Sequence, residues 1–226
     1  MRHTWIWVRT AYQVVRTIKD PQRLKDILGL APVLAPPQAM RRVTDGLWRI
    51  PSAAQALRER PRLGTVELDT LRTLPPGTFG RAFADHVVDN GLDLSALPHL
   101  PATTDTEYVR AHLQEVHDIW HVLTGFSTRV AGELGLQAFS LAQVGSPFAA
   151  GILTGGLANT LLYAFSERDV RMRAIVRGWL LGKRAKPLFG GAWARMWERP
   201  LEEIRAAFGL ELEAVEALLP AVPQSC

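Results

Sequence analysis

Apolar residues recur at intervals of three or four positions along much of the chain, which is the spacing of amphipathic helices. In residues 4–19, for example, Trp5, Val8, Tyr12 and Val15 share one helical face, and arginines recur every seven residues on another. No segment shows a convincing alternation of apolar and polar residues, the pattern of a half-buried strand. The chain is therefore predicted to be all-α.

Glycine, proline and capping residues divide this pattern into separate elements. We expect helices over residues 4–19, 22–30, 38–50, 52–59, 80–90, 105–124, 128–142, 200–208 and 211–219. Prolines and glycines are dense between residues 61 and 101, so this loop-rich segment should hold only short helices. A chain of 226 residues can build one sizeable core, so we expect a single-domain multi-helix bundle over residues 1–226.

The composition is that of a globular protein, because 47% of the residues are apolar and 21% are charged. This balance excludes an intrinsically disordered chain. The formal net charge of +4 permits binding to anionic lipid or phosphate without establishing it. Cys226 is the single cysteine, so no disulfide within the chain is expected. The N-terminus lacks the pattern of a cleavable signal peptide.

Residues 134–166 contain no charged side chain. Within this span, residues 148–165 form a run of eighteen uncharged residues, long enough for a membrane-spanning helix. Gly151, Gly155 and Asn159 weaken that interpretation. We expect a buried core or a wall for an apolar ligand, and insertion into a membrane surface or a spanning helix are the alternatives.

A cluster of basic residues follows the uncharged span directly. Arg171, Arg177, Lys183 and Arg184 belong to this cluster, in which acidic residues are few. An apolar surface beside such a cluster suits a ligand with an apolar tail and a phosphate or other anionic headgroup. These four residues are our candidates for headgroup binding, and a solvated helix face is the alternative.

His117, Asp118 and His121 bring metal-binding chemistry together within five positions. Histidines at i and i+4 project from the same helical face, one turn apart, so both imidazoles can reach one ion. Asp118 borders that face. Glu133 offers a further oxygen ligand, but it lies twelve residues beyond His121, which is about 18 Å along a straight helix. Since a metal–ligand bond is about 2 Å long, the chain must turn between these two residues.

The sequence offers this turn at Gly125. Glycine commonly ends a helix, and the Ser127 and Thr128 that follow are good N-cap residues for the next one. We therefore expect two helices folded back at Gly125, with Glu133 brought toward the histidine pair. Ser127 and Thr128 are interpreted as helix caps rather than as catalytic hydroxyls.

Two imidazoles with one or two carboxylates suit Zn²⁺, Fe²⁺, Co²⁺ or Mn²⁺, and among these divalent metals we favour zinc. With fewer than four protein ligands, an open position remains for water or substrate. Glu115 precedes the motif and offers an acceptor behind the ligands, with a solvated surface role as the alternative. Asp85 and His86, on the expected 80–90 helix, are weaker candidates to face this site.

Residues in and around this motif resemble a known family. They are Tyr108-Val109, Glu115-Val116-His117-Asp118, His121, Gly125, Thr128, Gly132-Glu133, Gln143 and Pro147. Similar segments outside it are Asp20-Pro21, Arg60-Pro61-Arg62, Leu74-Pro75-Pro76-Gly77-Thr78-Phe79-Gly80 and Trp197-Glu198. The chain resembles the Coq-four family of ubiquinone (coenzyme Q) biosynthesis proteins, whose signature is His-Asp-x-x-His followed by eleven residues and Glu. The chain matches this signature without a gap, and the resemblance covers nearly its full length.

The resemblance implies an all-helical protein, bound peripherally to a membrane, that holds a divalent metal and a polyprenyl-bearing molecule. Carried over to this chain, His117, Asp118, His121 and Glu133 are the metal ligands and take part in catalysis through the metal. The implied reaction removes the carboxylate at C1 of a polyprenylated hydroxybenzoate, with hydroxylation at that carbon. The prenyl tail is expected along residues 134–166.

The resemblance also implies partners, because the family is associated with assembling the quinone-biosynthesis enzymes. We expect a polyprenylated quinone precursor, those enzymes, a membrane surface and a second copy in a homodimer as partners, and no nucleic acid. The expected location is peripheral on the cytoplasmic side of a membrane, or the matrix side of the inner mitochondrial membrane in a eukaryote.

Two rival interpretations stay open. The first is a metal-dependent hydrolase. Zinc peptidases have the same His-x-x-x-His pair as this chain, but their general base is Glu where this chain has Asp118. Helical phosphohydrolases need additional His and Asp ligands elsewhere. The second rival is a non-catalytic lipid-binding scaffold, in which a structural metal only locks two helices together.

Overall fold

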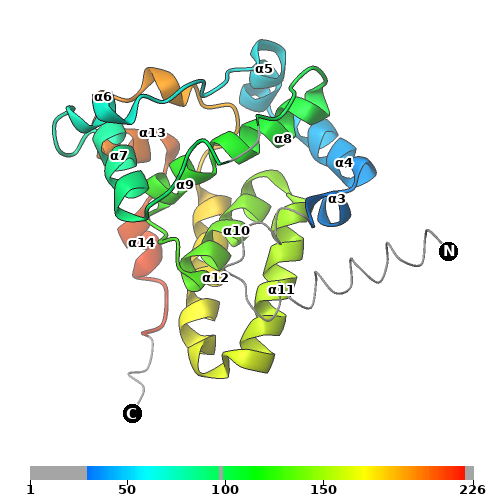
Figure 1. Ribbon diagram of the computed structural model, residues 1–226. Coiled ribbons are helices and arrows are strands. Elements are labelled where there is room, and N and C mark those ends of the chain that lie inside the picture. Colours follow the sequence, from blue (N-terminus) through cyan, green and yellow to red (C-terminus); the bar gives the residue numbers. More distant parts are fainter. Residues whose placement is uncertain (1–29, 97–98, 222–226) are drawn as a thin grey trace.

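The computed structural model describes residues 30–96 and 99–221 (Figure 1). The helix expected over residues 4–19 lies outside the described residues, as does all but the last residue of the one expected over 22–30. The expectation for Cys226 lies outside them as well.

Regular structure in the described residues is helical, which confirms the all-α prediction, and only an isolated bridge pairs Thr78 with Pro200. The helices are α3 (Ala31–Leu34), α4 (Pro37–Leu47), α5 (Pro51–Glu59), α6 (Leu68–Arg72), α7 (Phe79–Asp89), α8 (Asp105–Glu115), α9 (His117–Thr124), α10 (Val130–Val144), α11 (Pro147–Tyr163), α12 (Arg168–Arg184), α13 (Leu201–Phe208) and α14 (Leu212–Glu216). Short 3₁₀ turns at Phe165–Glu167 and Trp193–Arg195 complete them. The loop-rich segment 61–101 holds α6 and α7, as expected.

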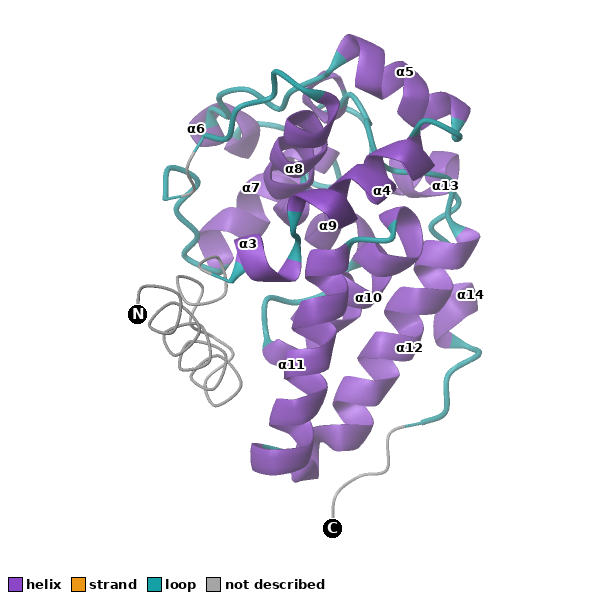
Figure 2. Cartoon of the chain, turned by 90° about the vertical axis from the view of Figure 1, so that its right-hand side faces the viewer, coloured by secondary structure: helices purple, strands orange, loops and turns teal. Residues whose placement is uncertain are grey.

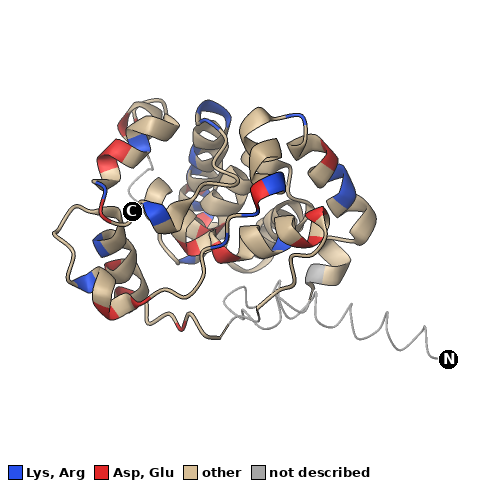
Figure 3. Ribbon diagram, turned by 90° about the horizontal axis from the view of Figure 1, so that it is seen from above, with Lys and Arg blue, Asp and Glu red and all other residues tan. Residues whose placement is uncertain are grey.

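The helices fall into two parts in both side views. Helices α4 to α8 and α13 form the upper part, and α10, α11 and α12 form the lower part (Figures 1 and 2). Helix α9 lies at the boundary, where it contacts α7, α8, α10 and α13. One cluster of buried apolar residues extends from Ala35 to Val215 and joins the parts. Basic and acidic residues are spread over many helices rather than gathered on one (Figure 3).

The helix expected over residues 105–124 is two helices in the structure. It begins as expected at Thr104, whose hydroxyl accepts from the Glu107 N–H in a capping box. It breaks at Val116, whose φ of −95° and ψ of 2° are not helical. The two halves have different anchors, because Glu115 on α8 accepts from Arg62 Nε at 2.8 Å, whereas α9 is held by α12 and α13. Local periodicity carries no signal of such competing tertiary contacts.

The capping role expected for Ser127 and Thr128 is wrong. Helix α10 begins later than expected, with Arg129 as its N-cap and no side-chain cap. The Thr128 hydroxyl instead donates to Asn90 Oδ1 at 2.6 Å, which ties the turn to the end of α7. A partner distant in sequence therefore takes the hydroxyl that the local pattern assigned to α10.

Helices α10 and α12 pack backbone against backbone. A Cβ atom at position 178 would collide with the carbonyl oxygen of Gly135, and one at position 182 would lie 2.7 Å from Ala142 Cβ. Glycine at 178 and 182 thus permits the close approach. This contact fixes α10, which carries Glu133, relative to the rest of the lower part.

The uncharged span 134–166 divides between two environments. Its α10 portion is core, since Leu134, Leu136 and Phe139 are each at most 2% exposed. The end of α11 is not core, because Leu161 and Leu162 are 66% and 68% exposed, so the prediction of a buried core is wrong there and that of an apolar ligand wall stays a prediction. No single helix in the described ranges is long and apolar enough to cross a membrane, although α11 and the segment 165–184 pass that test together with a bend of 118° between them.

Substituting Gly178 with alanine should destabilise the fold, because the added methyl meets a backbone carbonyl that cannot move without shifting α10. We expect a loss of about 2 kcal/mol or more in the free energy of unfolding, measured by urea titration. Gly46→Ala is the matched control, since it adds a methyl to an exposed helical position with open space and should stabilise by up to about 1 kcal/mol. Equal effects of the two substitutions would contradict the packing argument.

His112 is buried between α8 and the loop at 188–191. Its Nε2 accepts from the Gly190 N–H at 3.0 Å, so protonation there would break the hydrogen bond. Burial lowers the pKa of His112 from 6.5 to about 4. Between these pH values the unfolded chain binds a proton that the folded chain does not, so stability falls as the pH falls from 6.5 toward 4.

Replacing His112 with glutamine should remove this pH dependence while the amide oxygen still accepts from Gly190. As the pH drops from 7 to 4, the free energy of unfolding of the unsubstituted protein should fall by about 3 kcal/mol more than that of His112→Gln. Urea unfolding at several pH values measures the difference. Parallel curves for the two proteins would rule out His112 as the source.

Candidate metal centre

The reversal expected at Gly125 is present. Gly125 adopts a left-handed conformation with φ of 69°, ends α9, and donates its N–H to the His121 carbonyl at 2.8 Å. Helix α10 then runs back so that Glu133 faces the histidine pair. Glu133 Oε1 lies 3.1 Å from His121 Nε2, and Oε2 lies 3.6 Å from His117 Nε2. The turn thus brings together the four residues that the sequence singled out.

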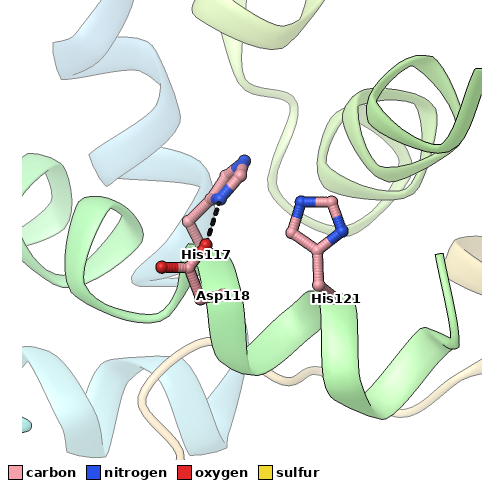
Figure 4. A group of neighbouring side chains, drawn as sticks. All are labelled: His117, Asp118 and His121. Atoms are coloured by element: carbon pink, nitrogen blue, oxygen red, sulfur yellow. Dashed lines mark hydrogen bonds and ion pairs between the residues drawn. The ribbon is translucent and has the colours of Figure 1, made fainter. Parts of the chain in front are cut away.

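Three of these residues share α9. His117, Asp118 and His121 place one potential ligand atom each within 4.8 Å of one another, as three neighbouring groups on one side of the helix (Figure 4). His117 Nδ1 lies 3.2 Å from Asp118 Oδ1. Since α9 begins at His117, these side chains project from a single short helix, and Glu133 approaches from α10.

The buried ring of His121 is held in one tautomer. Its Nδ1 lies 3.0 Å from the Phe126 carbonyl, which can only accept a hydrogen bond, so Nδ1 carries the proton. The opposite nitrogen, Nε2, therefore presents a lone pair. Although Glu133 Oε1 is 3.1 Å away, the geometry is not that of a hydrogen bond, and Nε2 has no hydrogen-bond partner among the described residues. This unpaired lone pair lies close to a carboxylate oxygen, and a cation bound by both atoms would satisfy it.

The charges of the cluster are strongly coupled. Burial opposes a charge on His117, but the hydrogen bond to Asp118 and the nearby Glu133 carboxylate outweigh it and raise the pKa of His117 to about 10. Burial likewise opposes the charges of both carboxylates, yet His117 holds the pKa of Asp118 and of Glu133 below the ordinary values. Two carboxylates thus require positive charge at this place. A divalent cation would supply it in exchange for the His117 proton.

The C-terminal end of α9 is fully capped. Its last four carbonyl groups would be orphaned in an isolated helix. The Gly125 N–H satisfies the first of them, Arg205 Nη2 and Nε donate to the next two at 2.8 and 2.9 Å, and Arg177 Nη2 donates to Thr124 O at 3.0 Å. Cationic caps also suit the negative end of the helix dipole. The two arginines therefore anchor the helix that carries three of the candidate ligands.

His86 reaches the cluster, whereas Asp85 and Glu115 are held elsewhere. The His86 and His121 rings stack with centroids 5.5 Å apart and 24° between their planes. Asp85 pairs with Arg81, and Glu115 pairs with Arg62, so Glu115 does not take the expected place behind the ligands. The signal for His86 was its spacing of three from Phe83, on the face of α7 that packs inward.

The four candidate headgroup residues do not form one surface. Arg171 is 4% exposed and donates to Asn159 Oδ1 at 2.6 Å and to Thr160 Oγ1 at 3.0 Å, in the interior of the α11–α12 hairpin. Arg177 caps α9 and lies over the Phe126 ring. Lys183 and Arg184 are exposed at the end of α12. Only these last two are free of a structural role that competes with a headgroup.

Two surface hollows flank the turn. One of about 440 Å³ is lined by His86 and Asn90 from α7 and its end, and by His121 from α9. The other, of about 490 Å³, is lined by Arg173, Arg177 and their neighbours on α12 and α14. The turn at 125–127 lines both hollows. His121 is thus the member of the cluster that lines the hollow beside α7, although its side chain is buried.

Comparison with known proteins places the chain in one family. The family model described as coenzyme Q (ubiquinone) biosynthesis protein Coq4 matches residues 6–213. The mitochondrial ubiquinone biosynthesis protein coq4 of Aspergillus niger is 31% identical over 204 residues, which cover 87% of this chain and 68% of that protein. The mitochondrial COQ4 homolog of Bos taurus is 30% identical over 195 residues, or 84% and 72% of the two chains.

A solved structure agrees with this match. A crystal structure from Nostoc punctiforme PCC 73102, provisionally described as a ubiquinone biosynthesis protein, superposes with a TM-score of 0.79 at 27% identity. The superposition covers 89% of this chain and 97% of that one. Sequence and fold therefore agree over most of the length, which confirms the resemblance, and the chain belongs to the Coq4 family of coenzyme Q (ubiquinone) biosynthesis proteins.

Proposed function

We propose that this ubiquinone biosynthesis protein binds a divalent metal through His117, Asp118, His121 and Glu133. At that centre it removes the C1 carboxylate of a polyprenylated hydroxybenzoate oxidatively, at a membrane surface. The observation that carries the proposal is the buried, unpaired Nε2 of His121, which lies 3.1 Å from a Glu133 carboxylate oxygen without a hydrogen bond. In the reaction the ring–carboxylate bond breaks and the carboxylate leaves as CO₂, while one atom of dioxygen becomes the ring hydroxyl. The other oxygen atom leaves in hydrogen peroxide, with water supplying the remaining oxygen and the protons.

The donor set fits the proposed ion. Two imidazole nitrogens and two carboxylates suit zinc, Fe²⁺, Co²⁺ and Mn²⁺, and among these we favour zinc. When bound, the ion would supply Lewis-acid or oxygen-activating chemistry beside the substrate's carboxylate or ring oxygen. The protein keeps the ligands in place, because the Phe126 carbonyl orients His121 and the arginine caps hold α9. The buried Ile119, Trp120 and Leu123 on the same helix keep water from its other side.

The exposed apolar side chains of the α11–α12 hairpin, called the lower hairpin below, support binding of a polyprenyl tail and contact with a membrane. They are Leu157, Leu161, Leu162, Tyr163, Phe165, Val170, Met172, Val176 and Trp179. Met172, Val176 and Trp179 recur at helical spacing on α12, and Lys183 continues that row toward its exposed end. Burial of a prenyl chain contributes about 0.8 kcal/mol per CH₂ group, so even partial burial would dominate affinity. Lys183 and Arg184 are the remaining candidates for an anionic headgroup.

This arrangement supports a peripheral location. The chain would lie on the cytoplasmic side of a membrane, or on the matrix side of the inner mitochondrial membrane in a eukaryote. Other quinone-biosynthesis enzymes and a second copy of the chain are proposed partners there. The name of the Bos taurus relative is consistent with the mitochondrial alternative.

A non-catalytic scaffold is the second candidate. One observation favours it: the ligands lie on two helices, α9 and α10, so an ion would cross-link them across the Gly125 turn. Metal binding would then contribute to folding rather than to a reaction. Membership in a ubiquinone biosynthesis family leaves the metal-dependent hydrolase without a supporting observation.

His121→Ala tests the catalytic proposal. The substitution removes a ligand, so metal content should fall from about one ion per chain to near zero, as measured by mass spectrometry of the purified protein. Helicity by circular dichroism should stay within about a tenth of its original value, since α9 keeps its arginine caps. Ubiquinone production in a complementation assay should be lost.

His99→Ala is the matched control, because His99 is an exposed histidine outside the cluster. It should keep both metal and ubiquinone production. Full complementation by His121→Ala would refute the catalytic metal. Unfolding of His121→Ala would instead favour the scaffold. Glu133→Gln, which retains the size and shape of the side chain, would then separate the scaffold from the catalytic proposal.

The exposed hairpin should mediate membrane binding. Replacing Leu161 and Leu162 together with glutamate adds two charges to an apolar surface, so flotation with vesicles of phosphatidylcholine and cardiolipin should fall at least about tenfold. Leu218→Glu, at a comparably exposed leucine after α14, is the control and should float as before. Unchanged flotation of the double variant would show that the membrane contact lies elsewhere.

A further inference from the structure

Helix α7 is held rigidly in one register. The Phe79 ring stacks on Trp197 with centroids 4.8 Å apart, and Phe83 packs on the same ring at 5.3 Å. A Cβ atom at position 80 would lie 3.0 Å from the Trp197 carbonyl oxygen, so glycine is needed at this approach. The Gly80 N–H donates to that same oxygen at 2.8 Å. The register of α7 is therefore fixed, and with it the place of His86 one turn after Phe83.

His86 lies against the metal cluster without being tied to it. Its ring stacks on His121, yet its Nε2 is buried with no hydrogen-bond partner among the described residues. A buried, unpaired imidazole nitrogen is costly and calls for a partner. The neighbouring polar groups have partners of their own: Asp85 pairs with Arg81, and Asn90 Oδ1 accepts from Thr128. His86 also lines the hollow of about 440 Å³ that His121 borders.

The geometry argues against His86 as a direct metal ligand. A nitrogen lone pair lies in the plane of its imidazole ring, and an ion shared by two histidines lies about 2 Å from each nitrogen. Rings stacked with 24° between their planes and centroids 5.5 Å apart direct their lone pairs along nearly parallel planes. Such lone pairs do not converge on one ion. His117 and His121 differ in this respect, because their ring planes meet at 71°.

We propose that His86 is a further functional residue of this centre: its imidazole nitrogen hydrogen-bonds the exchangeable oxygen or anionic group that a metal at His117, Asp118, His121 and Glu133 carries on its α7 side. His86 thereby selects for oxygen-bearing or anionic ligands, of which a carboxylate is one, on the open side of the ion. The inference rests on the proposed metal site, but not on the identity of the substrate. His86 lies outside the His-Asp-x-x-His-x11-Glu pattern.

Cobalt and azide provide a test that needs no turnover. The purified full chain is loaded with Co²⁺, whose visible absorption reports its ligands, and is titrated with azide. His86→Phe keeps the stacking on His121 but removes both nitrogens. We expect Co²⁺ affinity within about twofold of the unsubstituted protein, and azide affinity lower by about tenfold, the effect of one lost hydrogen bond. His86→Gln, which retains a polar group, should recover part of this loss.

Each outcome has a distinct meaning. Val88→Ala, at an exposed position on the same helix, should leave both affinities unchanged. If the unsubstituted protein binds no Co²⁺, the proposed metal site itself falls. If it binds Co²⁺ but not azide, or if His86→Phe binds azide as tightly as before, the role of His86 is overturned while the metal site stands. Loss of Co²⁺ from both His86→Phe and His86→Gln would make His86 a direct ligand and overturn the proposal as well.

Discussion

The candidate centre depends on one reversal of the chain, held from both sides. Gly125 permits the turn because it adopts a left-handed conformation that a side chain would strain. The turn alone does not place Glu133. The close contact of α10 with α12 and the arginine caps on α9 set the angle at which the two helices meet, and the Phe126 carbonyl then fixes the His121 ring. The four candidate ligands come together because three separate contacts restrain two helices.

Holding these four side chains close together costs electrostatic free energy, and a cation can offset this cost. Two carboxylates and two imidazoles share a half-buried space, and His117 takes up a proton to balance them, which is why its pKa is raised. The arginines nearby do not neutralise the cluster, since Arg177 and Arg205 are directed at backbone carbonyls and Arg177 also pairs with Glu216. The permanent cations of Arg177 and Arg205 therefore lie at the end of α9, and the charge that balances the carboxylates must come from the His117 proton or from the proposed metal.

The lower hairpin, α11 and α12, has a charged side chain inside and apolar side chains outside. Arg171 lies in its interior, where Asn159, Thr160 and Glu167 satisfy the guanidinium, while leucines and aromatic residues face outward. A polar interior with an apolar exterior is the reverse of an ordinary globular element, and it suits a surface that meets lipid. This surface belongs to the same α10–α12 unit that carries Glu133, so the proposed tail-binding and metal-binding regions are parts of one rigid framework.

Much of this protein could be predicted from the sequence. Helix periodicity determined the all-α class, and the spacing of His117, Asp118 and His121 with the stop at Gly125 determined the ligand cluster, because one helical turn and one chain reversal are local properties. The break at Val116, the burial of Arg171, the pairing of Glu115 and the approach of His86 were decided only by the tertiary structure. Each depends on a partner distant in the sequence, and periodicity reports which face of a helix is apolar but not which neighbour packs against it.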